Sequence, residues 1–369
     1  MKVLELFAGI GACSKALERI GIDLEIVDAV EIDKYAMASF NAIHNTNFEP
    51  QDITQWDKDI DVDLVMHGSP CQDFSLAGLQ AGGDEGSGTR SSLMYETIRI
   101  VKKLKPKYVV WENVKNLLSK KHRHNFDAYL EIMESLGYQN YYQVLNAKDY
   151  GIPQNRERVY TVSIRKDIDK GNFKFPEKEE LKLRLKDMLE NKVDEKYYLS
   201  DEKITKIQNS NFMQGGWRQP GIITLGNYMP SNHDASRIVS NKGLAPTVKE
   251  NHGPVTAVVT KNKRLNSLIN KTNFEEGKVL NMDLYNQTTN ENISQCLTEP
   301  HHNTQRLFDG YRIRKLTPKE CWRLMGFDDE DFEKAKDVPT SNTQLYKQAG
   351  NSIVVNVLEK IFKNLFKEE

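Results

Sequence analysis

Short apolar runs alternate with helical patterns through the first 165 residues, and this alternation constrains the fold more than any other feature of the chain. The apolar runs have the length of strands, and the segments between them repeat hydrophobic side chains every three or four residues. Strands that alternate with helices in this way build a sheet covered on both faces. We therefore expect an α/β fold with a doubly wound parallel sheet.

The expected elements follow from these runs and from the residues that punctuate them. A helix that opens near Ser91 should stop before Pro106, and helices should end at Gly21 and Gly137. The C-terminal segment is amphipathic and follows Gly350-Asn351-Ser352, a sequence that we interpret as a helix start. Strands are expected at 3–7, 25–30, 62–66, 108–111, 141–145 and 159–164, and helices at 11–20, 34–41, 91–105, 126–136 and 354–366.

Polar residues follow four of these strands directly. Phe7-Ala8-Gly9, Glu31, Cys71 and Glu112 each come just after the carboxyl end of a predicted strand. Because ligands bind at that edge of an open parallel sheet, these residues are expected to share one crevice.

Cys71 lies in the turn Gly68-Ser69-Pro70-Cys71-Gln72, after a buried strand. A thiol presented at a strand end on a proline-stiffened turn is placed like a nucleophile. The alternative is a buried structural cysteine, which is the commoner fate of a free thiol.

The first turn, 7–14, contains Gly9 and Gly11 where a helix should begin, and Glu31 follows Gly11 by 20 residues. This arrangement suits a nucleoside whose ribose hydroxyls bind a carboxylate. A dinucleotide site would have a third glycine where the chain has Ser14, so a pyrophosphate is disfavoured. A plain strand-to-helix turn is the other interpretation.

Composition narrows the classes of protein further. With 369 residues and 38% hydrophobic side chains, the chain can form a large domain and a smaller one. No apolar stretch reaches the ~18 residues of a membrane span, so a cytoplasmic protein is expected. The four cysteines lack CxxC spacing, which argues against a zinc site or a disulfide framework.

Charge is unevenly distributed along the chain. The net charge is −1, yet residues 205–274 hold nine lysines and arginines against two acids. This segment could follow a phosphate backbone, or it could be a solvated basic surface.

Six short motifs follow one another along the chain: Phe7-Ala8-Gly9-Ile10-Gly11, Glu31, Pro70-Cys71-Gln72, Glu112-Asn113-Val114, Gln154-Asn155-Arg156-Glu157-Arg158 and Gly350-Asn351-Ser352. In this order they resemble the motifs of the cytosine-C5 DNA methyltransferases of bacterial restriction-modification systems. The resemblance covers most of residues 1–165 and 312–362. It implies a Rossmann-like methyltransferase domain that binds S-adenosylmethionine, with a smaller, mostly irregular or β target-recognition domain.

The resemblance implies a domain division and a cofactor site. Residues 1–172 would form the catalytic and cofactor-binding domain and 173–311 the linker and recognition domain. Residues 312–344 would anchor the recognition domain, and 345–369 would return a helix to the first domain. The implied cofactor residues are Phe7, Gly9, Ile10, Gly11, Glu31, Ile32, Asp52, Pro70, Asn351 and Ser352.

The implied catalytic residues are Cys71, Glu112, Arg156 and Arg158, without a metal. Carbon 5 of cytosine is too electron-poor to take a methyl group unaided, so a thiolate must first add to carbon 6. Glu112 would contact ring N3 and the amine, Arg158 the base oxygen, and Arg156 would organise the neighbouring carboxylate and loop.

The implied partner is double-stranded DNA, met by a monomer, with a cognate restriction endonuclease as a separate protein. A buried base must be flipped out, and the glycine-rich segment 73–92 suits a lid. Rivals are an RNA cytosine-C5 methyltransferase, a dinucleotide-dependent oxidoreductase and a non-catalytic DNA-binding module. The candidate DNA-binding residues are Gln72, Ser75, Arg90, Arg218, Arg237, Lys261, Lys263 and Arg264.

Overall fold

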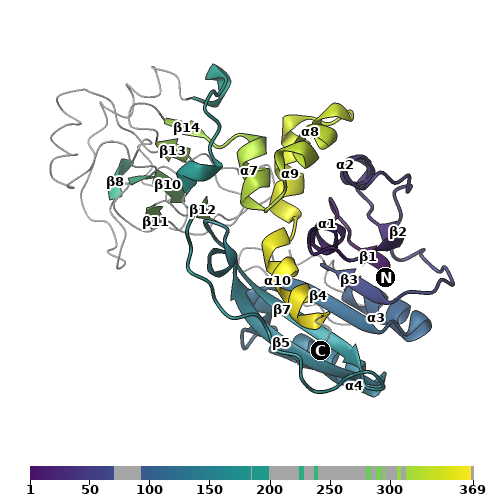
Figure 1. Ribbon diagram of the computed structural model, residues 1–369. Coiled ribbons are helices and arrows are strands. Elements are labelled where there is room, and N and C mark those ends of the chain that lie inside the picture. The colour runs from purple at the N-terminus through teal and green to yellow at the C-terminus, as the bar shows by residue number, and fades with distance from the viewer. Residues whose placement is uncertain are drawn as a thin grey trace, which may run out of the picture.

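The computed structural model describes residues 1–69, 93–183, 185–198 and 316–366, and within 199–315 it describes only the backbone of the strands. A six-stranded sheet forms the centre of the larger part, with strand order β2-β1-β3-β4-β7-β5 (Figure 1). Its strands are β1 (Lys2–Leu6), β2 (Glu25–Val30), β3 (Leu64–His67), β4 (Tyr108–Val114), β5 (Tyr138–Asn146) and β7 (Glu157–Arg165).

One strand of this sheet runs against the expectation of a parallel sheet. The first four strands are parallel, whereas β7 is antiparallel to both β4 and β5. Only a 3₁₀ turn, η4 (Ala147–Tyr150), and the two-residue strand β6 (Gln154–Asn155) separate β5 from β7. A parallel return needs a crossover of a dozen or more residues, so this short connection forces the reversal.

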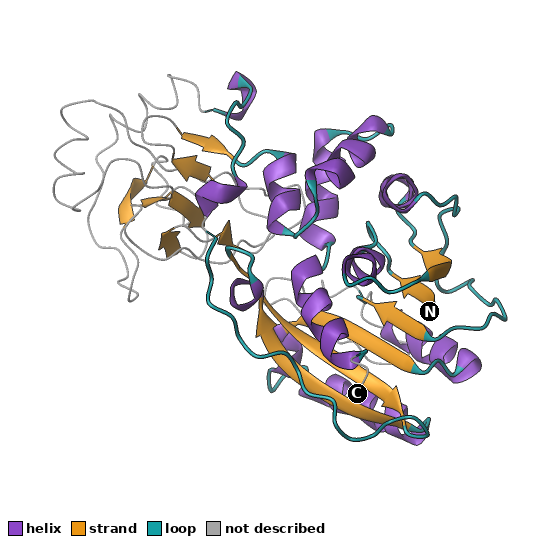
Figure 2. Ribbon diagram, in the orientation of Figure 1, coloured by secondary structure: helices purple, strands orange, loops and turns teal. Residues whose placement is uncertain are grey.

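Helices cover both faces of the sheet, as the alternation predicted (Figure 2). Val3 and Val110 belong to the apolar cluster that contains helices α1 and α10, whereas Leu4 and Val109 belong to the cluster that contains α3 and α4. Successive side chains of a strand point to opposite faces, so each strand contributes to both layers. The helices are α1 (Ala12–Arg19), α2 (Lys34–His44), α3 (Leu93–Leu104), α4 (Arg123–Ser135) and α10 (Val355–Leu365).

The described elements of segment 199–315 are short strands. Four of them form an antiparallel sheet in the order β11-β10-β13-β14, and β12 pairs with β6, which belongs to the segment between β5 and β7. These strands are β8 (Thr224–Asn227), β9 (Arg237–Val239), β10 (Leu280–Asp283), β11 (Thr288–Glu291), β12 (Ser294–Gln295), β13 (Arg306–Phe308) and β14 (Ile313–Lys315).

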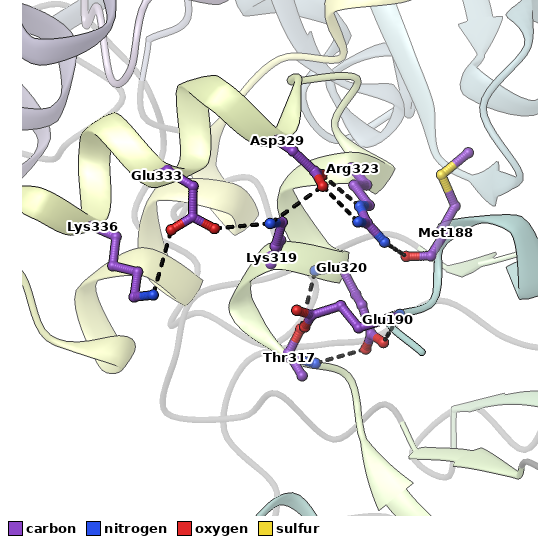
Figure 3. Close-up of polar contacts among 9 residues, drawn as sticks. All are labelled: Met188, Glu190, Thr317, Lys319, Glu320, Arg323, Asp329, Glu333 and Lys336. Atoms are coloured by element: carbon purple, nitrogen blue, oxygen red, sulfur yellow. Dashed lines mark hydrogen bonds and ion pairs between the residues drawn. The ribbon is translucent and has the colours of Figure 1, made fainter. Parts of the chain in front are cut away.

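Polar contacts around one short helix fasten the chain on both sides of segment 199–315. The Thr317 hydroxyl donates to Glu190, and Glu320 Oε1 accepts from the Glu190 amide at 2.8 Å (Figure 3). Arg323 donates to the carbonyl of Met188 at 3.0 Å. Thr317 and Glu320 also complete the capping box of α7.

Three more helices and three 3₁₀ turns complete the part of the chain that the structure describes. Helix α9 ends at Asn351, and α10 begins at Val355 after three non-helical residues. The interpretation of Gly350-Asn351-Ser352 as a helix start is therefore wrong, because this motif closes α9. In the described residues no helix has the length and apolar character to span a membrane. The remaining elements are α7 (Pro318–Leu324), α8 (Asp329–Asp337), α9 (Asn342–Asn351), η3 (Lys115–Leu118), η5 (Leu185–Met188) and η6 (Glu195–Tyr197).

Candidate active site

The turn between β1 and α1 has a left-handed backbone that glycine makes possible. Phe7, Gly9 and Gly11 have φ values of 54°, 56° and 79°. A Cβ on Gly11 would lie 2.1 Å from His44 Nε2, and His44 itself approaches the carbonyl oxygen of Ile10 at 3.4 Å. The lack of a side chain at position 11 thus keeps the turn close to helix α2 and exposes its backbone to a ligand.

Glu31 lies just past β2, beside this turn. Its two carboxylate oxygens accept hydrogen bonds from the backbone amides of Gly9, at 3.0 Å, and Asp33, at 2.8 Å. Burial raises the pKa of Glu31 above its ordinary value, and these two amides oppose the rise. Each oxygen retains a further lone pair, so the carboxylate can accept from a pair of ribose hydroxyls. The next residue, Ile32, is 70% exposed and offers an apolar surface for a nucleobase.

Glu5 fills the place where a dinucleotide's phosphates would bind. Its buried carboxylate accepts from the backbone amide of Ser14, at 2.9 Å, and from the Ser14 hydroxyl. These donors belong to the first turn of α1, the end of a helix that usually attracts a phosphate. A pyrophosphate would meet a carboxylate there, so the geometry disfavours the oxidoreductase alternative. The sequence signal was an acid within an apolar strand, followed nine residues later by serine.

Asp52 lies beside Glu31, because the amide of Gln51 donates to the Glu31 carbonyl at 2.9 Å. The Asp52 Oδ1 atom accepts from both the amide and the hydroxyl of Thr54, each at 2.9 Å. The Gln51 side chain donates to buried Asp28 at 2.8 Å, which fastens the segment to β2. The side chain of Gln51 therefore has a structural role, which is to hold this segment against β2.

Glu112 and Arg158 form an ion pair, with 3.0 Å between Arg158 Nε and Glu112 Oε1. Glu112 is only 9% exposed. The expectation that Glu112 follows a strand is wrong, because β4 continues to Val114 by pairing with β7. The last pair between β3 and β4 joins His67 to Trp111, so Glu112 lies one residue beyond the end of β3. Glu112 is thus still at the carboxyl edge of the parallel strands.

Ser69 connects the turn after β3 to β4. Its buried hydroxyl oxygen accepts from Trp111 Nε1 at 3.1 Å and from the Asn113 side chain at 3.5 Å. These two bonds fix Ser69, the last described residue of the turn, to β4, and Cys71 follows two residues later in the sequence. Sequence reasoning did not select Ser69, and the only signal was its place beside the Pro-Cys pair.

Arg156 joins the late motif to the core. It is buried and donates to the carbonyls of Gly350, at 3.2 Å, and Ser352, at 2.9 Å. From the same helix, α9, Lys347 forms an ion pair with Asp33 at 2.8 Å. Helix α9 therefore contacts both the Glu31 side and the Arg156 side of the sheet edge.

The two polar side chains at the end of the late motif, Gly350-Asn351-Ser352, differ in their exposure. Asn351 is exposed, whereas Ser352 is buried and its hydroxyl donates to the carbonyl of Ile353 at 3.1 Å.

Several predicted site residues lie outside the described residues, and Arg237 lies in β9, where only the backbone is described. The structure describes two cysteines, Cys13 and Cys321, and both are buried free thiols. The undescribed candidates are Pro70, Cys71, Gln72, Ser75, Arg90, Arg218, Lys261, Lys263 and Arg264.

A nucleoside-type turn, a strand-end carboxylate and a Glu-Arg pair on one edge of a doubly wound sheet define a methyltransferase-like site. The family model of the C-5 cytosine-specific DNA methylases matches residues 1–367. The chain belongs to this family, and it is a DNA (cytosine-5-)-methyltransferase.

Relatives of known class agree over nearly the whole chain. The orphan methyltransferase M.SPRI of Bacillus phage SPR is 34% identical over 99% of this chain and 97% of its own length. The type II methyltransferase M.HhaI of Haemophilus parahaemolyticus is 33% identical over 99% and 94%. These full-length relatives set aside the RNA-modifying and non-catalytic alternatives.

Solved structures support the fold. The Entamoeba histolytica methyltransferase EhMeth has a TM-score of 0.61 at 18% identity, with 99% of this chain and 98% of that chain covered. The S. pombe Dnmt2 methyltransferase has a TM-score of 0.57 at 17% identity, with 98% and 97% covered. At such identities the likeness concerns the fold alone.

Proposed function

We propose that this enzyme methylates carbon 5 of a cytosine that is flipped out of a short, specific duplex sequence, through a covalent bond between Cys71 and carbon 6. The observation that supports this most is the Ser69 connection, which ties the Pro-Cys turn to the strand carrying Glu112. A nucleophile two residues after Ser69 would lie near the sheet edge that carries Glu112.

S-adenosylmethionine fits the residues of the first turn. The space beside Gly9 is open for a ligand, Glu31 can accept the ribose hydroxyls, and exposed Ile32 can contact the adenine. Glu5 at the start of α1 is compatible with a cofactor that carries no phosphate. When bound, this cofactor supplies a methyl group on an electrophilic sulfonium. Phe7, Ile10, Asp52, Pro70, Asn351 and Ser352 complete the proposed set.

Cys71 would act as the thiolate that adds to carbon 6 of cytosine. Addition turns the ring into an enamine, whose carbon 5 is nucleophilic. Once carbon 5 carries the methyl group, its proton leaves to a base and the Cys71 sulfur is eliminated. The products are 5-methylcytosine and the free thiolate.

Glu112 and Arg158 would hold the base during this addition. Glu112 contacts ring N3 and the exocyclic amine, and a proton shared with N3 limits the negative charge that builds up on the ring. Arg158, at 3.0 Å from Glu112, fixes the carboxylate and can donate to the base oxygen. Arg156 would act as a positioning residue that does not touch the base, because it holds the loop at Gly350 and Ser352.

Four parts of the chain would have separate roles. Residues 1–172 would carry the chemistry, 173–311 the linker and target recognition, 312–344 the anchor, and 345–369 the returning helix. The contacts of Glu190 and Met188 with α7 support an anchor at 312–344. One flipped base needs one site, so a cytoplasmic monomer is proposed, with any restriction endonuclease for the same sequence as a separate protein. Gln72, Ser75, Arg90, Arg218, Arg237, Lys261, Lys263 and Arg264 are its proposed DNA contacts.

Bisulfite sequencing tests this function and identifies the target. Plasmid from cells that express the chain should contain cytosines protected from conversion in one short sequence context. Plasmid from cells that express Cys71→Ala at the same level should show none. Full conversion of every cytosine in the wild-type sample, at confirmed expression, would contradict the proposal.

A further inference from the structure

The segment 115–124 follows β4 directly and is the most densely basic part of the described chain near the site. It contains four lysines and arginines, two histidines and no acid. It comprises the 3₁₀ turn η3, a short connection and the start of α4 (Figure 1). Nothing in the catalytic proposal uses it.

The sheet register places this segment beside the base-binding pair. The last residue of β4, Val114, pairs with Arg158, and Glu112 lies two residues earlier. Farther along the segment, Arg123 donates to the hydroxyl of Tyr142 at 3.2 Å. Tyr142 pairs with Thr161, which in turn pairs with Trp111, the neighbour of Glu112. In the sheet register, both ends of the segment are therefore connected to strand positions within two residues of Glu112.

Two of its four cations are already neutralised. Lys115 pairs with Glu157 at 3.0 Å, and Arg123 pairs with Asp127 at 2.7 Å. Lys120 and Lys121 are both exposed, and neither has an ion pair with another described residue.

The backbone that carries these two lysines is well fixed. The carbonyl of Ser119 accepts from the amides of His122, at 3.0 Å, and Arg123, at 2.9 Å. Leu117 and His122 on either side are buried. Burial lowers the pKa of His122, and the charges of Lys121 and His124 add to the effect. A neutral, buried histidine thus anchors a turn from which two ammonium groups project.

We propose that Lys120 and Lys121 bind phosphates of the duplex DNA next to the flipped cytosine. The proposal rests on the proposed function, because it takes the cytosine to lie at Glu112. Duplex DNA carries one charge per ~1.7 Å of its axis, so phosphates must pass close to the mouth of the site. Such contacts orient the duplex and are indifferent to its sequence. This surface would complement a recognition domain that reads bases.

The test compares two double variants. Lys120→Gln/Lys121→Gln removes the proposed contacts. Lys102→Gln/Lys105→Gln removes two exposed lysines near the start of β4, at the opposite edge of the sheet, and is the matched control. The dissociation constant is measured between ~0.05 and ~0.3 M salt by titration of fluorescent 30-base-pair duplexes. One duplex contains the sequence found by bisulfite sequencing, and the other lacks it.

Loss of two phosphate contacts should reduce the slope of log K against log salt by about 1.8 and weaken binding up to roughly 60-fold at 0.1 M salt. The factor should be the same for both duplexes, and kcat at saturating DNA should stay at the wild-type value. An unchanged slope, or an equal loss in the control variant, would overturn the proposal. Failure of the proposed function would instead appear as an inactive wild-type enzyme, and the salt slope on the duplex that lacks the target sequence can be measured without activity.

Discussion

The indole nitrogen of Trp111 donates a hydrogen bond to the hydroxyl oxygen of Ser69 at 3.1 Å. Both side chains are buried, and they join the turn that precedes Cys71 to the strand that carries Glu112. If the proposed roles hold, the position of Cys71 relative to Glu112 should depend on this hydrogen bond. In reactions of this kind, small misplacements of reacting groups cost large factors in rate.

Ser69→Ala should slow formation of the covalent adduct by about 10-fold or more, since the turn loses its tie to β4. It should also cost about 1–3 kcal/mol of stability, because Trp111 Nε1 is left unsatisfied. Stopped reactions and urea unfolding measure the two effects.

Trp111→Phe in the Ser69→Ala background provides the matched control, because neither partner then remains unsatisfied. The stability cost of the double variant should be smaller than the sum of the two single costs. Strict additivity of the two costs would show that the bond contributes nothing.

Glu112→Gln should lower the single-turnover rate of methylation by about 10²–10⁴-fold, because the amide can no longer share a proton with the ring. Arg158→Lys should lower it as well, since a lysine lacks the Nε atom that contacts Glu112. The rate is measured at saturating DNA and cofactor. Lys166→Gln changes an exposed residue just after the end of β7 and should match the wild type. A comparable loss of rate in this variant would indicate a general effect on folding.

As pH is lowered, cofactor affinity should begin to fall at a higher pH than the pKa of an ordinary glutamate would predict. Burial raises the pKa of Glu31, and only its carboxylate form accepts two ribose hydroxyls well. As pH falls through this raised pKa, the carboxylate gains a proton and affinity is lost. Calorimetric titration with S-adenosylmethionine between pH 7.5 and 5 measures the loss.

Glu31→Gln should bind the cofactor about 10-fold more weakly at pH 7.5, because a charge-assisted hydrogen bond is lost. Its affinity should hardly change with pH. If the variant and the wild type kept parallel pH profiles, another group would be responsible.

His67, four residues before Cys71, should make the fold less stable in acid. Burial lowers its pKa to about 3, so it stays neutral in the fold and takes up a proton only on unfolding. The unfolded chain then binds more protons below about pH 6.5, and stability falls by up to about 1.4 kcal/mol per pH unit.

His67→Phe keeps an aromatic ring on Trp111, against which His67 is stacked at 5.5 Å. Between pH 7.5 and 5.5 the wild type should lose about 1.4 kcal/mol more than this variant in urea unfolding. Equal losses would mean that His67 is already accessible to protons in the folded protein.

Local patterns in the sequence predicted most elements, because their signals are short-range. The strand Glu25–Val30 and the helix that stops before Pro106 are examples. The reversal of β7 and the extension of β4 to Val114 were not predictable in this way. Both depend on pairing between strands far apart in the chain, and β4 lengthens only because β7 lies beside it.

The candidate site shows the same division. Glu31 and Glu112 were recognisable from motifs, and the structure places them on the expected edge. Ser69 and Glu5 were not selected, since their roles depend on partners that only folding brings close. The basic segment 115–124 has only four of the chain's 51 lysines and arginines, so its charge alone does not distinguish it in the sequence.

The covalent bond between Cys71 and carbon 6 is the central claim, and trapping on fluorinated DNA tests it most directly. Duplex DNA with 5-fluorocytosine at the target position cannot lose a C5 proton, so the adduct should persist. With S-adenosylmethionine present, mass spectrometry of the digested wild-type complex should find the nucleotide on the peptide that contains Cys71, and Cys71→Ala should give no adduct. An adduct that still forms in Cys71→Ala, or that maps to another residue, would contradict the account.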